Sequence, residues 1–231
     1  MTRARPLDLL TLTLLGLGLL TLGAGAFFAL TAPPDADQGY VYRIFFIHVP
    51  SAWVGMVALF VALFYSIVYI ARGSLKYDRI ATACIEVALI FLFLTLFTGM
   101  LWGRPTWGVY WTWEPRLTTF AILLVVYIGY FVVRSAIEDP EMRAKASAAI
   151  SILGAINVPI TYMSVVWWRS IHQVQTFNVT TGESRFDPAM LPALFVNLAA
   201  FTLLYIGFVR LRSVLAGREA ARQDLGSPVA N

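Results

Sequence analysis

Six long apolar stretches constrain this sequence more than any other feature. They cover residues 9–30, 49–71, 80–101, 117–133, 144–166 and 191–209. A helix needs about 20 mostly apolar residues to cross the hydrocarbon core of a bilayer, and each stretch is close to that length. Charged residues make up only 13% of the chain, whereas soluble domains carry about 25%. The sequence therefore predicts an all-α integral membrane protein with six transmembrane helices.

These stretches use most of the chain, so residues 1–231 are predicted to form a single membrane domain. The composition excludes an ordinary cytosolic enzyme. It also excludes a nucleic-acid-binding protein, because the basic residues are spread over many short segments and form no single patch. The one cysteine, Cys84, excludes a disulfide framework and a Cys-x-x-Cys motif.

The distribution of Lys and Arg predicts the orientation in the membrane, because cytoplasmic loops are enriched in these residues. Most of the 17 basic residues fall on one side when the N-terminus is placed in the cytoplasm. Both termini are then cytoplasmic, and residues 210–231 form a cytoplasmic tail. The outer loops cover about 31–48, 102–116 and 167–190.

Both histidines of the chain, His48 and His172, fall on this outer side, just before the second stretch and just after the fifth. The loop at 102–116 is rich in tryptophan. It contains Trp102, Trp107, Trp111 and Trp113. Tryptophan often forms belts at membrane surfaces, but a belt decorates both interfaces, and the predicted cytoplasmic side carries no tryptophan. This asymmetry favours a specific aromatic surface over a simple belt.

Two histidines and an aromatic surface together are typical of a porphyrin site. Neutral imidazole is a common metal ligand, but two alone make a poor zinc site, because zinc prefers three or four protein ligands. Iron in a porphyrin needs only two more ligands, and indole rings can cover the flat macrocycle. Arg43 and Arg116 lie on the same side and could pair with its propionates. The alternatives are that the histidines are polar anchors and that Arg116 caps its helix or pairs with Glu114.

The outer segments resemble the tryptophan-rich WWD proteins that handle heme in cytochrome c biogenesis, and within them the heme exporter protein C (CcmC) family. The resemblance covers about residues 40–209. It rests on residues 107–118 (WGVYWTWEPRLT), 42–50 (YRIFFIHVP), 156–160 (INVPI), 164–173 (SVVWWRSIHQ) and 187–190 (DPAM).

The resemblance implies that heme b is held on the periplasmic side of the bacterial inner membrane. His48 and His172 would be the axial ligands of the iron. The platform under the heme would consist of Trp107, Trp111, Trp113 and Glu114. The family usually has Asp where this chain has Glu114, so a carboxylate is kept with a longer reach.

The same resemblance implies transfer of heme to the chaperone CcmE, in an assembly with CcmD and the ABC transporter pair CcmA and CcmB. It leaves open whether the protein also has a ligase-like role in attaching heme to CcmE. Three other functions remain as alternatives: a bis-histidine b-type electron carrier, a small-molecule transporter or channel, and a self-sufficient heme lyase. The absence of histidine inside the predicted spans argues against the electron carrier. The small number of spans and histidines argues against the lyase.

Overall fold

The computed structural model describes residues 8–173 and 187–226, and in these ranges the chain is helical without strands. The helices are α1 (Leu9–Thr31), η1 (Tyr40–Ile44), α2 (Phe45–Arg72), α3 (Leu75–Trp107), α4 (Pro115–Ala136), α5 (Pro140–Ala155), α6 (Asn157–Trp167), η2 (Pro188–Met190) and α7 (Leu191–Gly226). Six helical spans are long and apolar enough to cross a membrane, with α5 and α6 counted together. This confirms the predicted all-α membrane fold.

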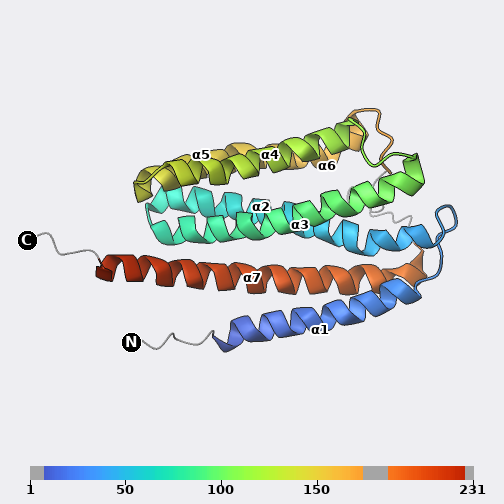
Figure 1. Ribbon diagram of the computed structural model, residues 1–231, viewed down its shortest axis with the longest axis horizontal. Helices are drawn as coiled ribbons and strands as arrows, with labels where there is room; N and C mark the ends of the chain where they lie inside the picture. Colours follow the sequence, from blue (N-terminus) through green and yellow to red (C-terminus); the bar gives the residue numbers. More distant parts are fainter. Residues whose placement is uncertain (1–7, 174–186, 227–231) are drawn as a thin grey trace, which may run out of the picture.

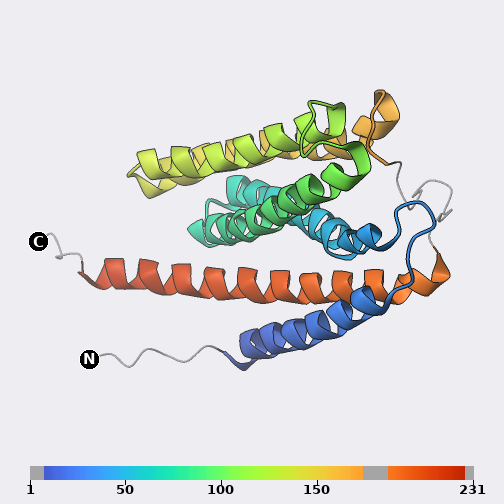
Figure 2. The same ribbon diagram turned by 45° about the vertical axis from the view of Figure 1, so that its right-hand side comes forward.

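The helices form three layers that lie nearly parallel to one another (Figures 1 and 2). The α2–α3 hairpin lies in the middle, α4, α5 and α6 cover one side, and α1 and α7 cover the other. The first and last helices of the chain therefore pack side by side, and the described chain begins and ends at the same end of the bundle (Figure 1). The predicted cytoplasmic location of that end stays a prediction.

Close approach of α1 to α7 depends on small residues, as is common between membrane helices. A Cβ on Gly25 would lie 2.5 Å from Oδ1 of Asn197. With no side chain at position 25, the buried Asn197 amide reaches the backbone and donates to Gly25 O at 2.9 Å. An amide buried in a membrane helix needs such a partner, so this contact fixes the register of α1 against α7.

Pro159 lies inside the fifth predicted stretch, where proline is expected to kink a helix, and the structure is interrupted there. Proline lacks an N–H and clashes with the carbonyl four residues earlier, which here belongs to Ala155. The chain accordingly separates into α5, ending at Ala155, and α6, beginning at Asn157. Nδ2 of Asn157 donates to Thr119 O at 2.8 Å, so the break is tied to α4.

Several predicted boundaries are wrong. The second span begins at Phe45, because η1 runs directly into α2, so His48 and Pro50 lie inside a helix. The predicted loop at 102–116 is helical as far as Trp107, and only residues 108–114 are non-helical. The end of α3 is set by Gly108 in the left-handed conformation at φ 78°, a common helix C-cap, and not by the end of the apolar run. Within the predicted tail at 210–231, α7 continues as far as Gly226, and the cytoplasmic location of this tail stays a prediction.

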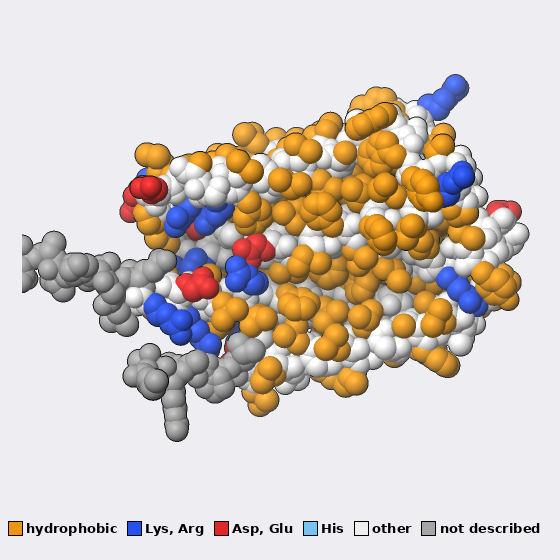
Figure 3. Space-filling model, in the orientation of Figure 1, with side chains coloured by type: hydrophobic (Ala, Val, Ile, Leu, Met, Phe, Trp, Pro, Cys, Tyr) orange, Lys and Arg blue, Asp and Glu red, His pale blue; other side chains and the backbone are white. Residues whose placement is uncertain are grey.

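Charged side chains gather at the end of the bundle where the described chain begins and ends, and apolar side chains cover its middle on the face shown in Figure 3. Two ion pairs join helices in this region. The half-buried Arg134 and the buried Asp78 lie 2.7 Å apart, and Arg212 and Glu86 lie 2.5 Å apart. Glu86, a carboxylate inside the third predicted stretch, therefore pairs with Arg212 of the neighbouring α7.

Candidate functional site

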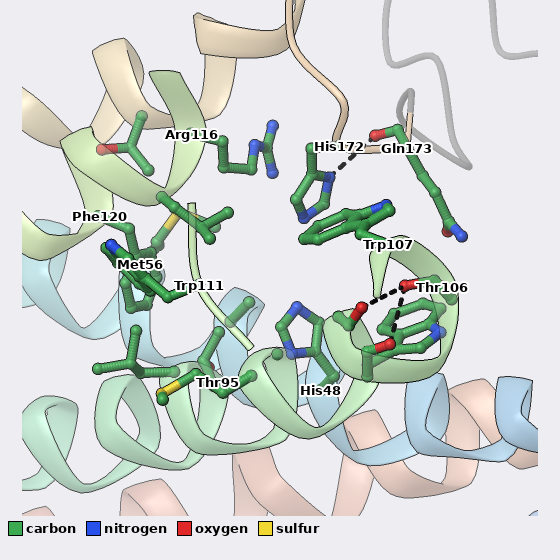
Figure 4. Close-up of a pocket in the computed structure, with 18 residues that line it drawn as sticks. His48, Met56, Thr95, Thr106, Trp107, Trp111, Arg116, Phe120, His172 and Gln173 are labelled. Atoms are coloured by element: carbon green, nitrogen blue, oxygen red, sulfur yellow. Dashed lines mark hydrogen bonds between the residues drawn. The ribbon is translucent and has the colours of Figure 1, made fainter. Parts of the chain in front are cut away.

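A cavity at the opposite end of the bundle brings both histidines together. Its walls come from α2, α3, α4, α6, the segment 108–114 and the segment that follows α6. Side chains at its surface include His48, Trp102, Trp107, Trp111, Arg116 and His172. His48 and His172 lie on opposite sides of the cavity, with Trp107 next to His172 (Figure 4). Residues more than 100 positions apart therefore converge on one site.

His48 is held firmly by α3. Its Nδ1 lies 3.1 Å from Oγ1 of Thr98, and that hydroxyl donates its own proton to Leu94 O at 2.7 Å. The hydroxyl oxygen must then accept from Nδ1–H, which leaves Nε2 unprotonated, with a lone pair for a metal. Trp102 packs edge-on against the imidazole, with 5.6 Å between ring centroids.

A glycine makes room for this imidazole. A Cβ on Gly99 would lie 3.0 Å from Cε1 of His48, closer than normal side-chain contacts allow. Gly99 lies one residue after Thr98 on α3. The same turn of α3 therefore supplies both the hydrogen bond to His48 and the space that its ring occupies.

His172 lies on a non-helical segment. Like His48, it is protonated on Nδ1, but its hydrogen-bond partner is a backbone carbonyl. The segment is non-helical because α6 ends at Trp167 and Trp168 is extended. Nδ1 of His172 lies 3.1 Å from Gln173 O. A carbonyl only accepts, so Nδ1 carries the proton and Nε2 is bare.

Burial and the nearby Arg116 cation lower the pKa of His172 to about 4. Its imidazole is therefore neutral at pH 7, which is the form that binds metal. The ring lies 5.9 Å from that of Trp107, measured between centroids.

Glu114 connects α4 to the His172 segment. Its Oε1 accepts from Leu117 N at 2.6 Å and caps the N-terminus of α4. Its Oε2 accepts from the Ser170 hydroxyl, and the Ser170 oxygen accepts in turn from His172 N at 3.0 Å. Glu114 is buried and does not line the cavity. It holds the segment that carries His172.

The tryptophans of the predicted platform separate into two groups. Trp107 and Trp111 line the cavity. Trp113 does not line it: its side chain is 75% exposed and packs edge-on against Trp111. Trp102 was not among the predicted site residues, but it lines the cavity and donates from Nε1 to Gln38 Oε1 at 2.7 Å.

The two predicted arginines differ in position. Arg116 lines the cavity, donates from Nη2 to Tyr162 O at 2.8 Å, and has a buried Nε without a hydrogen-bond partner. Arg43 does not line the cavity. Its Nη2 donates to Ala32 O at 2.9 Å, and its guanidinium lies over the Tyr40 ring. The structure thus brings Arg116, but not Arg43, to the histidines.

Sequence reasoning missed the residues that orient the histidines: Thr98, Gly99, Ser170 and Gln173. Ser170 and Gln173 are close to His172 in sequence and could have been considered as its partners. Thr98 lies four residues before Trp102, a spacing that places both on one helix face. That signal was hidden because α3 was expected to end at residue 101.

Comparison with known proteins gives the family. A family model described as heme exporter protein C, CcmC, matches residues 4–225. The chain belongs to the CcmC family. The match is longer than the 40–209 expected from the sequence motifs, and it confirms the resemblance.

Three bacterial members of the CcmC family illustrate the similarity, and each is named heme exporter protein C. The one from Bradyrhizobium diazoefficiens is 40% identical over 185 residues, covering 80% of this chain and 70% of the relative. The Escherichia coli K12 protein is 34% identical over 197 residues, with coverage of 83% and 77%. The Haemophilus influenzae protein is 32% identical over 215 residues, with coverage of 92% and 85%.

Proposed function

We propose that this CcmC-family protein holds heme b between His48 and His172 and passes it on during cytochrome c maturation. One observation carries the proposal: two imidazoles from distant segments face one cavity, and each is hydrogen-bonded through Nδ1 so that Nε2 can bind iron. Among the described residues no group of three or more His, Cys, Asp or Glu could hold a bare metal ion. Two ligands suit an iron whose other four positions a porphyrin already fills.

The rest of the donor set also fits heme. The buried Nε of Arg116 has no partner, and a guanidinium N–H is well suited to a propionate carboxylate. Thr161 lines the same cavity and has a buried hydroxyl without a partner. Trp107 and Trp111 supply apolar ring surface for a flat macrocycle. Heme would supply the iron and the vinyl groups, and these side chains would orient it.

Entry of heme requires movement of the aromatic side chains. The cavity encloses about 80 Å³, which holds a few water molecules and is far smaller than a porphyrin. Trp107 and Trp111 come from the end of α3 and the short segment 108–114. We infer that these two indoles turn outward when heme binds and then cover its face.

Orientation and partners follow the family. The histidine end of the bundle is opposite to the end that gathers the charged side chains, so we place it at the periplasmic face of the bacterial inner membrane, with the termini in the cytoplasm. CcmE would receive the heme there, and CcmD, CcmA and CcmB would complete the assembly. Exposed aromatic side chains next to the cavity support a docking surface for CcmE. They belong to Tyr110, Trp113, Trp167 and Trp168.

Absorption spectra test the axial ligands directly. We expect the protein purified in detergent to show a low-spin heme spectrum, and His48→Ala and His172→Ala each to lose heme or to shift it to high spin. Arg116→Gln should weaken heme binding, and Arg43→Gln is the matched control outside the cavity. Unchanged spectra in both histidine variants would refute the proposal. Addition of CcmE separates the functions: a carrier for maturation transfers heme to it, whereas a b-type electron carrier keeps its heme.

A further inference from the structure

A second hollow lies beside α2, and its lining shares no residue with the histidine cavity. It is a groove of about 1030 Å³ between α1, α2 and α7, closed at one end by the start of α3. Its walls are mostly apolar and include Leu14, Val57, Val61 and Ile206. Since α1 packs chiefly on α7 and not on α2, the space between α1 and α2 stays open. We propose that this groove binds one anionic phospholipid from the leaflet on the side of the chain ends.

Basic side chains at one end of the groove favour a lipid with an anionic headgroup. Lys76, Arg79 and Arg210 line the groove near the end of the bundle where the described chain begins and ends. Arg210 pairs with Asp8 at 3.2 Å. In the described part of the chain, neither Lys76 nor Arg79 forms an ion pair or a side-chain hydrogen bond. Two cations thus remain for a phosphate at the depth of the headgroups.

A buried hydroxyl marks a second polar point in the groove. Tyr205 is 8% exposed and lines the groove, and its hydroxyl contacts the thiol of Cys84, which is only a weak hydrogen-bonding group. A helix rises about 1.5 Å per residue, so Tyr205 lies roughly 7.5 Å from Arg210 along α7, toward the middle of the membrane. A diacyl lipid carries its ester carbonyls between headgroup and tails. A phosphate near the basic residues would therefore place an ester oxygen at the level of the Tyr205 hydroxyl.

The polarity of the groove favours a lipid. On α7 its lining runs from Leu198 to Gly217, about 28 Å at 1.5 Å per residue. The basic side chains lie at one end of the groove, and the remaining lining is mostly apolar. A cationic end joined to an apolar length matches the headgroup and the acyl tails of one anionic phospholipid.

Native mass spectrometry of the purified protein tests this proposal. The full chain is incubated in detergent with equal amounts of phosphatidylglycerol and phosphatidylcholine, and the lipid retained per protein is measured. We expect one phosphatidylglycerol to be retained in preference. A basic residue near the headgroups changes binding of an anionic lipid about fivefold, so Lys76→Gln with Arg79→Gln should lower that preference about 25-fold. Excess inorganic phosphate should not displace the lipid, because its tails also bind.

Two further variants keep the outcome specific. Arg72→Gln with Lys145→Gln removes the same charge from exposed sites outside the groove and should leave retention unchanged. Val57→Trp fills the apolar part without changing charge and should reduce retention of both lipids. Equal retention of the two lipids by the wild type, an equal loss in the control pair, or release by phosphate alone overturns the proposal. So does a groove found to hold a helix of another protein in place of lipid.

Discussion

The link from Glu114 through Ser170 to His172 predicts that two residues outside the cavity control the affinity for heme. The carboxylate of Glu114 is buried and accepts from both Leu117 N and the Ser170 hydroxyl. Glu114→Ala removes both contacts, and Ser170→Ala removes only the second. Ser170→Ala also takes away the acceptor of His172 N.

The magnitude follows from these contacts. Loss of an N-cap costs about 1 kcal/mol, and loss of a hydrogen bond to a charged group costs about 1.5–3 kcal/mol. We therefore expect Ser170→Ala to destabilise the ordered conformation of the His172 segment by about 1.5–3 kcal/mol. Glu114→Ala should destabilise it by about 1 kcal/mol more, because it also removes the N-cap. If the ordered segment is the form that binds heme, the apparent Kd rises as the ordered fraction falls, by at most about 10- to 150-fold for Ser170→Ala, a limit reached when the segment of the variant is mostly disordered.

The assay is a double-mutant cycle on heme affinity, measured by absorption titration of the purified protein. Glu114→Ala, Ser170→Ala and the double variant are compared, with Glu114→Gln as a variant that keeps an oxygen for the N-cap. We expect a coupling of about 1.5–3 kcal/mol between the two positions. The low-spin spectrum should persist at saturating heme, because His172 itself is intact. Additive effects, with a coupling below about 0.5 kcal/mol, would refute the link.

Three other substitutions test particular contacts. Gly99→Ala should raise the Kd for heme about tenfold, because the new methyl lies 3.0 Å from the His48 ring; a heme titration that matches the wild type contradicts this. Asp78→Ala should lower the free energy of unfolding in detergent by about 1–3 kcal/mol, because it removes the charged partner of the half-buried Arg134; an unchanged free energy of unfolding would show that the pair does not stabilise the fold. Gly25→Ala should lower the free energy of unfolding by about 1–3 kcal/mol in the same assay, because the added methyl overpacks α1 against α7. An unchanged free energy of unfolding would show that α1 can shift to make room for the methyl.

The number and type of the helices could be predicted from the sequence because the bilayer imposes a minimum apolar length on each span. The ends of the helices could not, because hydrogen bonds and caps set them. Gly108 ends α3 after six further residues beyond the apolar run that finishes at residue 101, and η1 leads into α2 ahead of His48. Apolar length contains no signal for either feature. Pro159 was the exception, since proline breaks a helix by its own covalent geometry.

The sequence predicts the chemistry of the site. It does not show which of several similar residues belong to the site. Imidazole and indole are rare enough in this chain for their clustering to be visible in the sequence. Arg43 and Arg116 look alike there, since both are basic residues near the same boundary. Only the fold separates them: Arg43 binds Ala32 O, and Arg116 faces the cavity. The choice depends on contacts between helices that no local pattern encodes.

The supports of the two histidines are unequal, and this difference suits the proposed transfer of heme to another protein. His48 lies within α2 and is held by a hydrogen bond and ring packing from a second long helix, α3. His172 lies on a short non-helical segment that, within residues 8–173, is joined to α4 by the hydrogen bonds from Glu114 through Ser170. Short segments with few buried contacts open at lower free energy than packed helices. Iron held between these residues would therefore separate first from His172, on the side where Trp107 and the exposed aromatic side chains lie. A receiving protein that binds there could take the heme while His48 still holds it in place.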